Sequence, residues 1–337
     1  MTSSLFDLYD KTVLRHPMAS LFAVIALTIA MAFGLPNFKL DASADSLTLE
    51  HDDDLNFFRE VVQRYGSDNF LIVTFSPKSG DLFDDTNLET LKALREDLAT
   101  IDGVEGILSM LDVPLLYSPM VAVADLKEEL NTLLSEGVDK QLAKQEFLNS
   151  PIYKDVILSA DGQTTGLLAT LALDETYLQL VTARDDLRLV RDTQGLTPEQ
   201  EIELEKVSLE FLNYRTIKAA QDHQRVAEVR ALITGYRDNA TIFLGGPDMI
   251  TADMVDFIKS DLVVFGTGIL LFIIATLALI FRQIRWVILP LATCTFCLIT
   301  ILGFLSWIDW RLTVISSNFV SLLLIITLAL TIHLIVR

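Results

Sequence analysis

The chain has 337 residues, of which 51% are hydrophobic, and its formal net charge is −19. The charge is unevenly distributed, because residues 36–261 contain 20 Lys and Arg against 42 Asp and Glu. A region this acidic is not expected to bind nucleic acid or an anionic lipid surface, since both would repel it.

An amphipathic segment and a membrane anchor are expected at the N-terminus. In residues 1–16 apolar and charged side chains alternate, which is typical of a short helix on the cytoplasmic face of a membrane. Residues 17–38 are apolar and long enough to cross the bilayer once. A cleaved signal peptide is the alternative, because Ala42-Ser43-Ala44 resembles a cleavage site. The apolar core is longer than in a usual signal peptide and ends well before these residues, so we expect an uncleaved anchor.

Residues 39–261 are expected to form a large water-exposed domain. The run Asp52-Asp53-Asp54 could bind calcium, but no EF-hand spacing follows it, and the start of a helix at Leu55–Tyr65 explains it better. The next apolar patterns predict a βαβ unit with strands at Asn69–Phe75 and Val104–Met110. The helix between them is marked by apolar residues at helical spacing, namely Leu88, Leu91, Leu94, Leu98 and Ile101.

A second set of elements completes this domain. A hairpin is predicted from Tyr153–Leu158 and Thr165–Leu173, followed by a helix at Gln224–Tyr236 and a strand at Ala240–Leu244. The order β-α-β-β-α-β is typical of a ferredoxin-like fold. In that fold we expect Asn69–Phe75 or its neighbours to pair with Ala240–Leu244.

Two charged helical segments are expected as insertions in this fold. They cover Val121–Phe147 and Glu175–Lys218, and both should project from the sheet. Inside the second, Thr197-Pro198-Glu199-Gln200 predicts a helix start with a capping box and proline at the first helical position.

Residues 262–337 contain three apolar runs without Asp, Glu, Lys or Arg: Leu262–Phe281, Trp286–Ile308 and Leu312–Val336. A helix of about 20 apolar residues spans the roughly 30 Å hydrocarbon core of a bilayer, so each run predicts a transmembrane helix. The links between them are too short to hold a domain, which predicts a tight bundle. The sequence therefore predicts an α+β membrane protein with four transmembrane helices, one before the large domain and three after it.

Basic residues in the short loops predict the orientation of these spans. They are Lys11 and Arg15 before the first span, Arg282 and Arg285 between the second and third, and Arg337 after the fourth. If every span crosses, all of them lie on one side of the membrane and Asp309–Arg311 lies on the other. The positive-inside rule places the basic side in the cytoplasm and the large domain outside.

The junction between the large domain and the second span carries a family resemblance. Residues 245–250 read Gly-Gly-Pro-Asp-Met-Ile, and a short helix then leads through Ser260-Asp261-Leu262 straight into the membrane. This junction resembles the resistance-nodulation-division (RND) superfamily, in particular the lipid-exporting branch that includes the mycobacterial large membrane proteins and the hopanoid transporters. Residues 57–73 are similar to the entry into the first porter strand of that family. Full members repeat the unit of one span, porter domain and clustered spans twice, so the resemblance implies an N-terminal half.

The resemblance also implies a mechanism, in which proton flow through the spans drives the porter domain. The family usually carries the proton on an Asp in the fourth span, in a Gly-x-x-x-Asp pattern ahead of a His. In this sequence the His position is His333, the Asp position is Ala329 and the Gly position is Ile325. The missing carboxylate predicts that this half does not itself carry the proton.

The remaining polar residues of the fourth span are candidates for a membrane site. At about 100° per residue, Asn318 and His333 share the helix face on which Ala329 stands. Intramembrane ionisable residues are often functional, whereas the alternative is that His333 simply reaches the cytoplasmic interface. Thr327 and Thr331 face roughly the other way and should bond the backbone or a neighbouring helix.

The substrate path is expected near the base of the porter domain. The resemblance implies that Leu35–Leu40 and Met249–Val263 form the floor of an apolar cavity there, with Phe57 and Phe58 in its wall. The expected partners are membrane lipids or other hydrophobic small molecules, together with a second transporter half or identical subunits. The expected location is the inner membrane of a bacterium, with the large domain in the periplasm.

Other functions are less well supported by the sequence. Cys294 and Cys297 form a C-x-x-C pair, but within a membrane helix they are expected to pack as small apolar residues rather than to bind metal. No nucleophile elbow, phosphate loop or zinc motif is present, so neither an enzyme nor a cofactor is expected. The alternative to a transporter is a membrane scaffold or sensor that presents the acidic domain to a partner protein in the periplasm.

Overall fold

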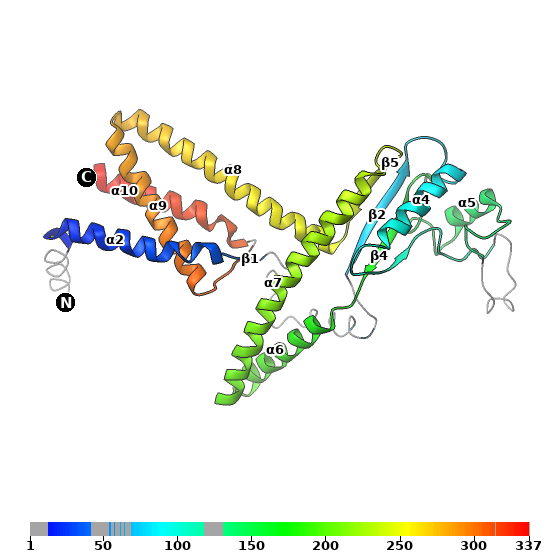
Figure 1. Cartoon of the computed structure of the whole chain (residues 1–337), viewed down its shortest axis with the longest axis horizontal. Helices are drawn as coiled ribbons and strands as arrows, with labels where there is room; N and C mark the ends of the chain where they lie inside the picture. The colour runs from blue at the N-terminus through cyan, green and yellow to red at the C-terminus, as the bar shows by residue number, and fades with distance from the viewer. Residues whose placement is uncertain are drawn as a thin grey trace. The chain divides into compact units, whose positions relative to one another are not determined.

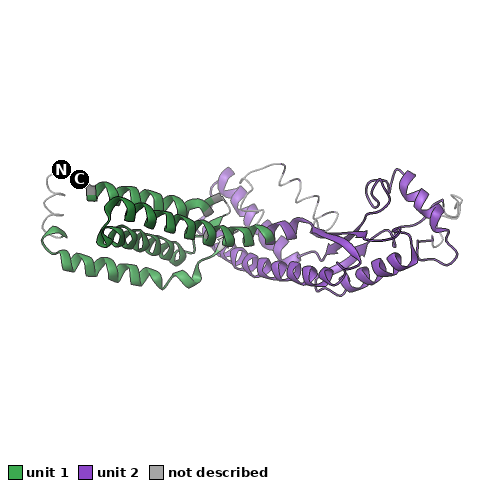
Figure 2. Ribbon diagram, turned by 90° about the horizontal axis from the view of Figure 1, so that it is seen from above, with its two compact units in different colours: residues 1–49, 253–337 green, residues 50–252 purple. Residues whose placement is uncertain are grey.

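The computed structural model describes residues 13–41, 69–117, 131–313 and 315–336, and four single helical residues, Asp54, Phe57, Val61 and Arg64. The chain divides into two compact units (Figure 2). Unit 1 contains residues 1–49 and 253–337, and unit 2 contains residues 50–252. Figure 1 shows the order of the elements along the chain.

Unit 2 is built on an antiparallel sheet of four strands. These are β2 (Phe70–Pro77), β3 (Val104–Leu108), β4 (Thr165–Leu171) and β5 (Ala240–Gly245), in the spatial order β3-β4-β2-β5. The predicted pairing of the first and last strands is confirmed, because β2 and β5 are neighbours. Strand β4 lies on the other side of β2, with Ile72 opposite Leu168.

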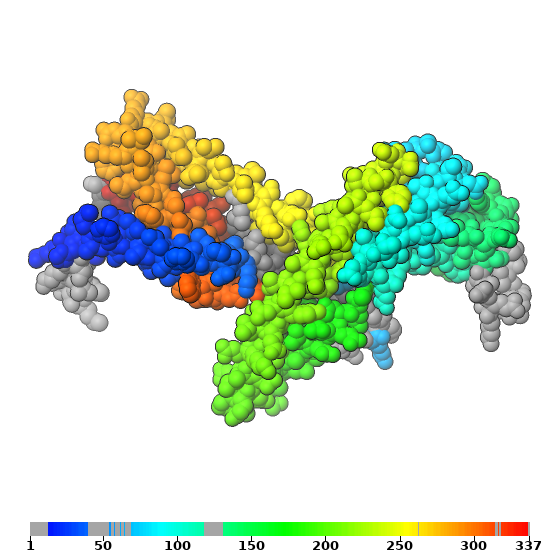
Figure 3. Space-filling view, in the orientation of Figure 1, coloured from blue at the N-terminus to red at the C-terminus, as the bar shows by residue number. Residues whose placement is uncertain are grey.

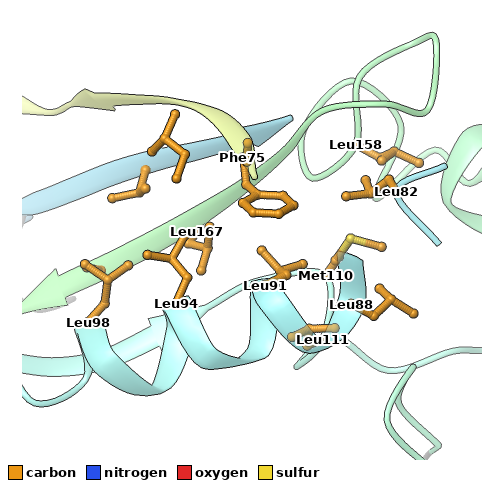
Figure 4. Close-up of a cluster of buried hydrophobic side chains, with 14 of the residues drawn as sticks. Phe75, Leu82, Leu88, Leu91, Leu94, Leu98, Met110, Leu111, Leu158 and Leu167 are labelled. Atoms are coloured by element: carbon orange, nitrogen blue, oxygen red, sulfur yellow. The ribbon is translucent and has the colours of Figure 1, made fainter. Parts of the chain in front are cut away.

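One face of the sheet carries the hydrophobic core. Helix α4 (Asp85–Leu98) turns its leucines toward Phe75 and Leu167 of the sheet (Figure 4). Its buried residues are Leu88, Leu91, Leu94 and Leu98, as their helical spacing predicts. The same core includes Val226, Val229 and Ile233 from helix α7 (Pro198–Thr234). Both helices thus contribute to a core on one side of the sheet.

Two predictions for the middle of unit 2 are wrong in detail. Residues 153–158 form turns with isolated bridges at Leu158 instead of a strand, and Asp155 has a positive φ of 61° that interrupts extended backbone. The predicted hairpin is reduced to a single antiparallel bridge between Leu158 and Thr165, and from Leu168 onward the neighbour of β4 on this side is β3. Within the described part of the first insertion the helix is α5 (Lys140–Asn149), and residues 118–130 lie outside the described residues.

The second insertion is a pair of helices that pack side by side (Figure 3). Helix α6 (Glu175–Thr193) is followed by α7, whose predicted capping box between Thr197 and Gln200 is confirmed. The predicted helix Gln224–Tyr236 is not a separate element, because α7 is continuous for 37 residues. Between the two helices the guanidinium of Arg184 lies 4.2 Å from the ring centre of the fully buried Phe211. This cation–π contact replaces part of the hydration that the Arg184 guanidinium loses when it is buried.

Unit 1 contains the apolar helices. Among the described residues, three helices are long and apolar enough to cross a membrane: Pro17–Asn37, Pro247–Phe281 and Ile284–Trp307. The first comprises α2 (Pro17–Ala32) and the 3-10 helix η2 (Leu35–Asn37), and the others are α8 (Pro247–Phe281) and α9 (Ile284–Trp307). Helix α9 packs against both α2 and α10 (Phe319–Val336).

The predicted fourth span begins later than expected. Residues Leu312–Thr313 form strand β6, which pairs with β1 (Leu40–Asp41), and Ile315–Asn318 form the 3-10 helix η5. The side chains of Thr313 and Ser316 each accept a hydrogen bond from the other residue's backbone N–H. Such local bonds compete with an α-helix and explain why α10 starts only at Phe319. The count of four membrane-spanning helices depends on this shorter helix and stays a prediction.

Candidate functional site

The two residues predicted for a membrane site lie in different elements. Asn318 ends η5, whereas His333 lies in the last turn of α10, and both side chains are exposed. Their predicted common face assumed one helix from Leu312 onward, and the structure has no such helix. Fifteen residues at a rise of about 1.5 Å would also separate them by about 22 Å, so they do not form one local site.

The face of α10 on which the resemblance implied a carboxylate, at Ala329, points away from the described helices of this chain. Ile325, Ala329 and His333 succeed one another at four-residue spacing, and all three are exposed. The opposite side of α10 faces α9. There the hydroxyl of Thr327 donates to the sulfur of Cys297 at 3.6 Å, and the hydroxyl of Thr331 donates to the carbonyl of Thr327 at 2.7 Å. The predicted bonding of both threonines is thus confirmed.

The C-x-x-C pair of α9 also faces α10. The sulfur of Cys294 lies 4.0 Å from the carbonyl oxygen of Leu324, which is long for a hydrogen bond and typical of packing. In the part of the chain that the structure describes, no three His, Cys, Asp or Glu side chains cluster as metal ligands. Packing between helices accounts for both cysteines.

The contact between α2 and α9 is very close. The hydroxyls of Thr28 and Thr300 lie 3.2 Å apart, and the Thr28 side chain is buried. At Gly303 a Cβ atom would lie only 2.1 Å from the carbonyl oxygen of Met31, and at Gly34 it would lie 2.6 Å from that of Gly303. Small residues allow membrane helices to approach in this way, so this contact fixes α2 on α9.

A cluster of three charged residues joins the end of the first span to the loop before α10. The ammonium of Lys39 lies 2.9 Å from the carboxylate of Asp309, and the Arg311 guanidinium lies 3.6 Å from the same carboxylate. The N–H of Leu312 donates to the carbonyl of Lys39 at 3.2 Å. Sequence reasoning missed this cluster, although all three residues directly flank apolar runs predicted to end on the same side of the membrane.

The charges of the cluster set the protonation of Asp309. Partial burial raises the pKa of its carboxyl, but the Lys39 hydrogen bond and the positive charges of Arg311 and Lys39 outweigh this, so the pKa is lowered. A lowered pKa in the folded state contributes stability above the unfolded-state value of about 3.9, and that contribution is lost as the pH falls through the folded value.

We therefore expect Asp309→Asn to lower the stability of unit 1 at pH 7 and to have no such effect at strongly acidic pH. About a third of the side chain is exposed, so the expected loss at pH 7 is no more than about 1 kcal/mol. Thermal unfolding of the detergent-solubilised chain at both pH values measures it. An equal loss at both would show that charge is not the reason.

Unit 2 contains a pocket of about 390 Å³ beside the start of α6. Lys218 and Arg225 line it, and both donate to the carboxylate of Asp222, at 2.8 and 2.6 Å. Arg225 also donates to the carbonyl of Asp102 at 2.8 Å. The spacing of Lys218, Asp222 and Arg225 on one helix could have predicted these ion pairs. Because the two cations are held by protein groups, the arrangement chiefly fixes α7 against the turn before β3.

The predicted substrate-path residues are only partly described. Phe57 is 67% exposed, whereas Phe58 lies outside the described residues. An exposed phenylalanine is compatible with a surface that contacts hydrophobic molecules, but it is also common on protein surfaces. The apolar cavity therefore stays a prediction.

Comparison with known proteins connects the second half of the chain with one family. Residues 211–333 match the MMPL family. The match begins within α7, continues through β5, α8 and α9, and ends in α10 at His333. A search of the curated proteins finds no match for the chain.

Proposed function

We propose that this chain is part of an RND-type secondary transporter that moves lipids or other hydrophobic molecules out of the inner membrane of a bacterium. The match of residues 211–333 to the MMPL family carries the proposal. It includes the strand β5, the long helix α8 and the helix α9, that is, both sheet and membrane elements. Three helices long and apolar enough to cross a bilayer agree with a multi-pass membrane protein.

The sheet of unit 2 is proposed to be a ferredoxin-like porter domain in the periplasm. Its strand order β3-β4-β2-β5, with α4 and α7 connecting the strands, supports the fold. The basic link containing Arg282 and Arg285 supports the orientation, because it would lie on the cytoplasmic side. Phe57 and Phe58 are proposed to line the substrate path.

This half is proposed not to carry the driving proton. None of the apolar runs Leu262–Phe281, Trp286–Ile308 and Leu312–Val336 contains a carboxylate, and Ala329 stands where the family has an Asp. Asn318 and His333 are then hydrogen-bonding residues, and the proton site belongs to a second transporter half. These apolar runs contain no acid with which His333 could exchange a proton.

The proposal predicts that His333→Ala lowers export by about tenfold or less, as for loss of a supporting partner at a functional site. The assay follows a fluorescent phospholipid in inverted membrane vesicles with an imposed pH gradient, using the full-length protein. Leu334→Ala is the matched control, because Leu334 is the adjacent exposed residue of α10.

Two outcomes would contradict the proposal at different points. Complete loss of coupling in a normally folded His333→Ala protein would make His333 a primary proton carrier. If the unmodified protein moves no phospholipid either with or without a pH gradient, the result would favour the scaffold function instead.

A further inference from the structure

A second pocket of unit 2, of about 350 Å³, lies beside the end of α5. One face of this helix lines it, because Leu142, Glu146 and Asn149 follow one another at spacings of four and three residues. Tyr117, from the segment after β3, also lines the pocket and is 61% exposed. The pocket therefore combines an aromatic ring, an apolar side chain and a carboxylate.

The carboxylate of Glu146 is buried and is fixed by the backbone. Glu146 is only 6% exposed, and its two carboxylate oxygens accept hydrogen bonds from the N–H of Leu116 at 2.6 Å and from the N–H of Tyr117 at 3.0 Å. Both donors are neutral, so they do not cancel the negative charge. A carboxylate has about four lone-pair sites, which leaves room for further donors.

No positive charge of the described residues neutralises Glu146. The two basic residues of α5, Lys140 and Lys144, instead pair with aspartates at and before the start of α4. Among the described residues none forms an ion pair with Glu146. Burial raises the pKa of the Tyr153 phenol, and the negative charge of Glu146 raises it further. Because a buried charge without an opposite charge is costly, a cation in the pocket would be stabilised by Glu146.

Three further features of this region favour a cation over an anion. The pocket lies against the last turn of α5, and the C-terminal end of a helix carries a partial negative charge. The exposed ring of Tyr117 offers a π face to a positive charge. Residues 36–261 contain 42 Asp and Glu against 20 Lys and Arg, so the field of the domain attracts cations.

We propose that this pocket binds a small organic ammonium ion, with the charged nitrogen at the Glu146 carboxylate and the apolar part against Tyr117 and Leu142. The carboxylate and the ring together provide an ion pair and a cation–π contact, which a metal ion would not use in this combination. A volume of about 350 Å³ is near the lower end for ligand pockets, which favours a small amine. The proposal is independent of transport.

The test uses the full-length chain in dodecyl maltoside and phosphate buffer at neutral pH, so that the added probe is the only amine of low molecular mass. The probe is 4-fluorophenethylammonium, and its binding is followed by the line width of its fluorine NMR signal. The control ligand is 2-(4-fluorophenyl)ethanol, which has the same ring and the same number of heavy atoms but no charge. The ammonium is expected to bind at least about tenfold more tightly, because its hydrogen bond to the carboxylate is charge-assisted. No binding of the ammonium, or equal affinity for both ligands, would overturn the proposal.

A pair of variants tests whether the probe binds in this pocket. Glu146 itself is not replaced, because it holds the backbone of Leu116 and Tyr117. Asn149 is exposed and lines the pocket, so Asn149→Lys places a tethered ammonium there and should lower the affinity for the probe about tenfold. Gln141→Lys adds the same charge at an exposed position of α5 outside the pocket lining and should leave the affinity unchanged. Equal affinities in the two variants would overturn the proposal.

Discussion

Replacing Gly303 with alanine is expected to separate α2 from α9 and to destabilise unit 1 by about 3 kcal/mol or more. The new Cβ atom would lie 2.1 Å from the oxygen and 2.5 Å from the carbon of the Met31 carbonyl. Both atoms belong to the backbone, so no side chain can rotate to make room. The helices must move apart, and the Thr28–Thr300 contact at 3.2 Å would be lost with them.

The control separates this close approach from the general effect of glycine in a helix. At Gly266 and Gly268 of α8 an added Cβ would meet nothing within 4 Å. Alanine is favoured over glycine in a helix by about 1 kcal/mol, so both control variants should be as stable as the original or more stable. Thermal unfolding of the solubilised chain, followed by tryptophan fluorescence, compares the three. A Gly303→Ala protein as stable as the Gly266→Ala protein would show that α2 and α9 do not pack this closely.

Periodicity predicted the elements whose environment is uniform along their length. The apolar run of α9 ends within two residues of its predicted bounds, because the membrane environment is the same for every residue in it. The spacing of Leu88, Leu91, Leu94 and Leu98 placed α4 correctly against the sheet, because one face of the helix is buried along its whole length. In such elements the local pattern and the tertiary environment agree.

The elements that sequence reasoning missed depend on contacts between distant residues. Residues 312–318 are apolar enough to continue a membrane helix, but Leu312 pairs with Leu40, more than 270 positions earlier in the chain. That pairing, with the Thr313–Ser316 bonds, replaces the predicted first turns of the fourth span. Tyr153–Leu158 has a strand-like pattern, yet only Leu158 bridges to β4, and β3 lies beside the rest of that strand. Local periodicity contains no information about which distant strand pairs with a given segment.

The candidate membrane site was affected by the same error. The common face of Asn318 and His333 followed from counting about 100° per residue along a helix that the structure interrupts. The prediction for Thr327 and Thr331 was confirmed, because both lie within the continuous part of α10. A face calculated from sequence is therefore dependable only between residues of one unbroken helix.

Gly246 gives the other large expected effect, at the junction between the sheet and α8. It is the single residue between β5 and α8, within the residues that match the MMPL family. Its φ is +122°, which strongly favours glycine, and an added Cβ would lie 2.4 Å from the carbonyl oxygen of Phe70. Gly246→Ala is therefore expected to lower the free energy of unfolding of unit 2 by about 3 kcal/mol or more, because backbone strain and overpacking add.

Gly195→Ala separates these two causes, because Gly195 also has a positive φ, +79°, but an added Cβ there meets nothing within 4 Å. It should cost only the backbone strain of about 1 kcal/mol. Chemical denaturation of the full-length chain, followed by the far-ultraviolet circular dichroism of the sheet domain, measures both variants. If the close approach at Gly246 holds β2 and the start of α8 together, only Gly246→Ala should also loosen β5 from β2. Faster amide exchange at Phe243, whose N–H donates to Thr74 of β2, would show this. Equal losses in the two variants would show that the left-handed backbone matters at Gly246 and the contact with Phe70 does not.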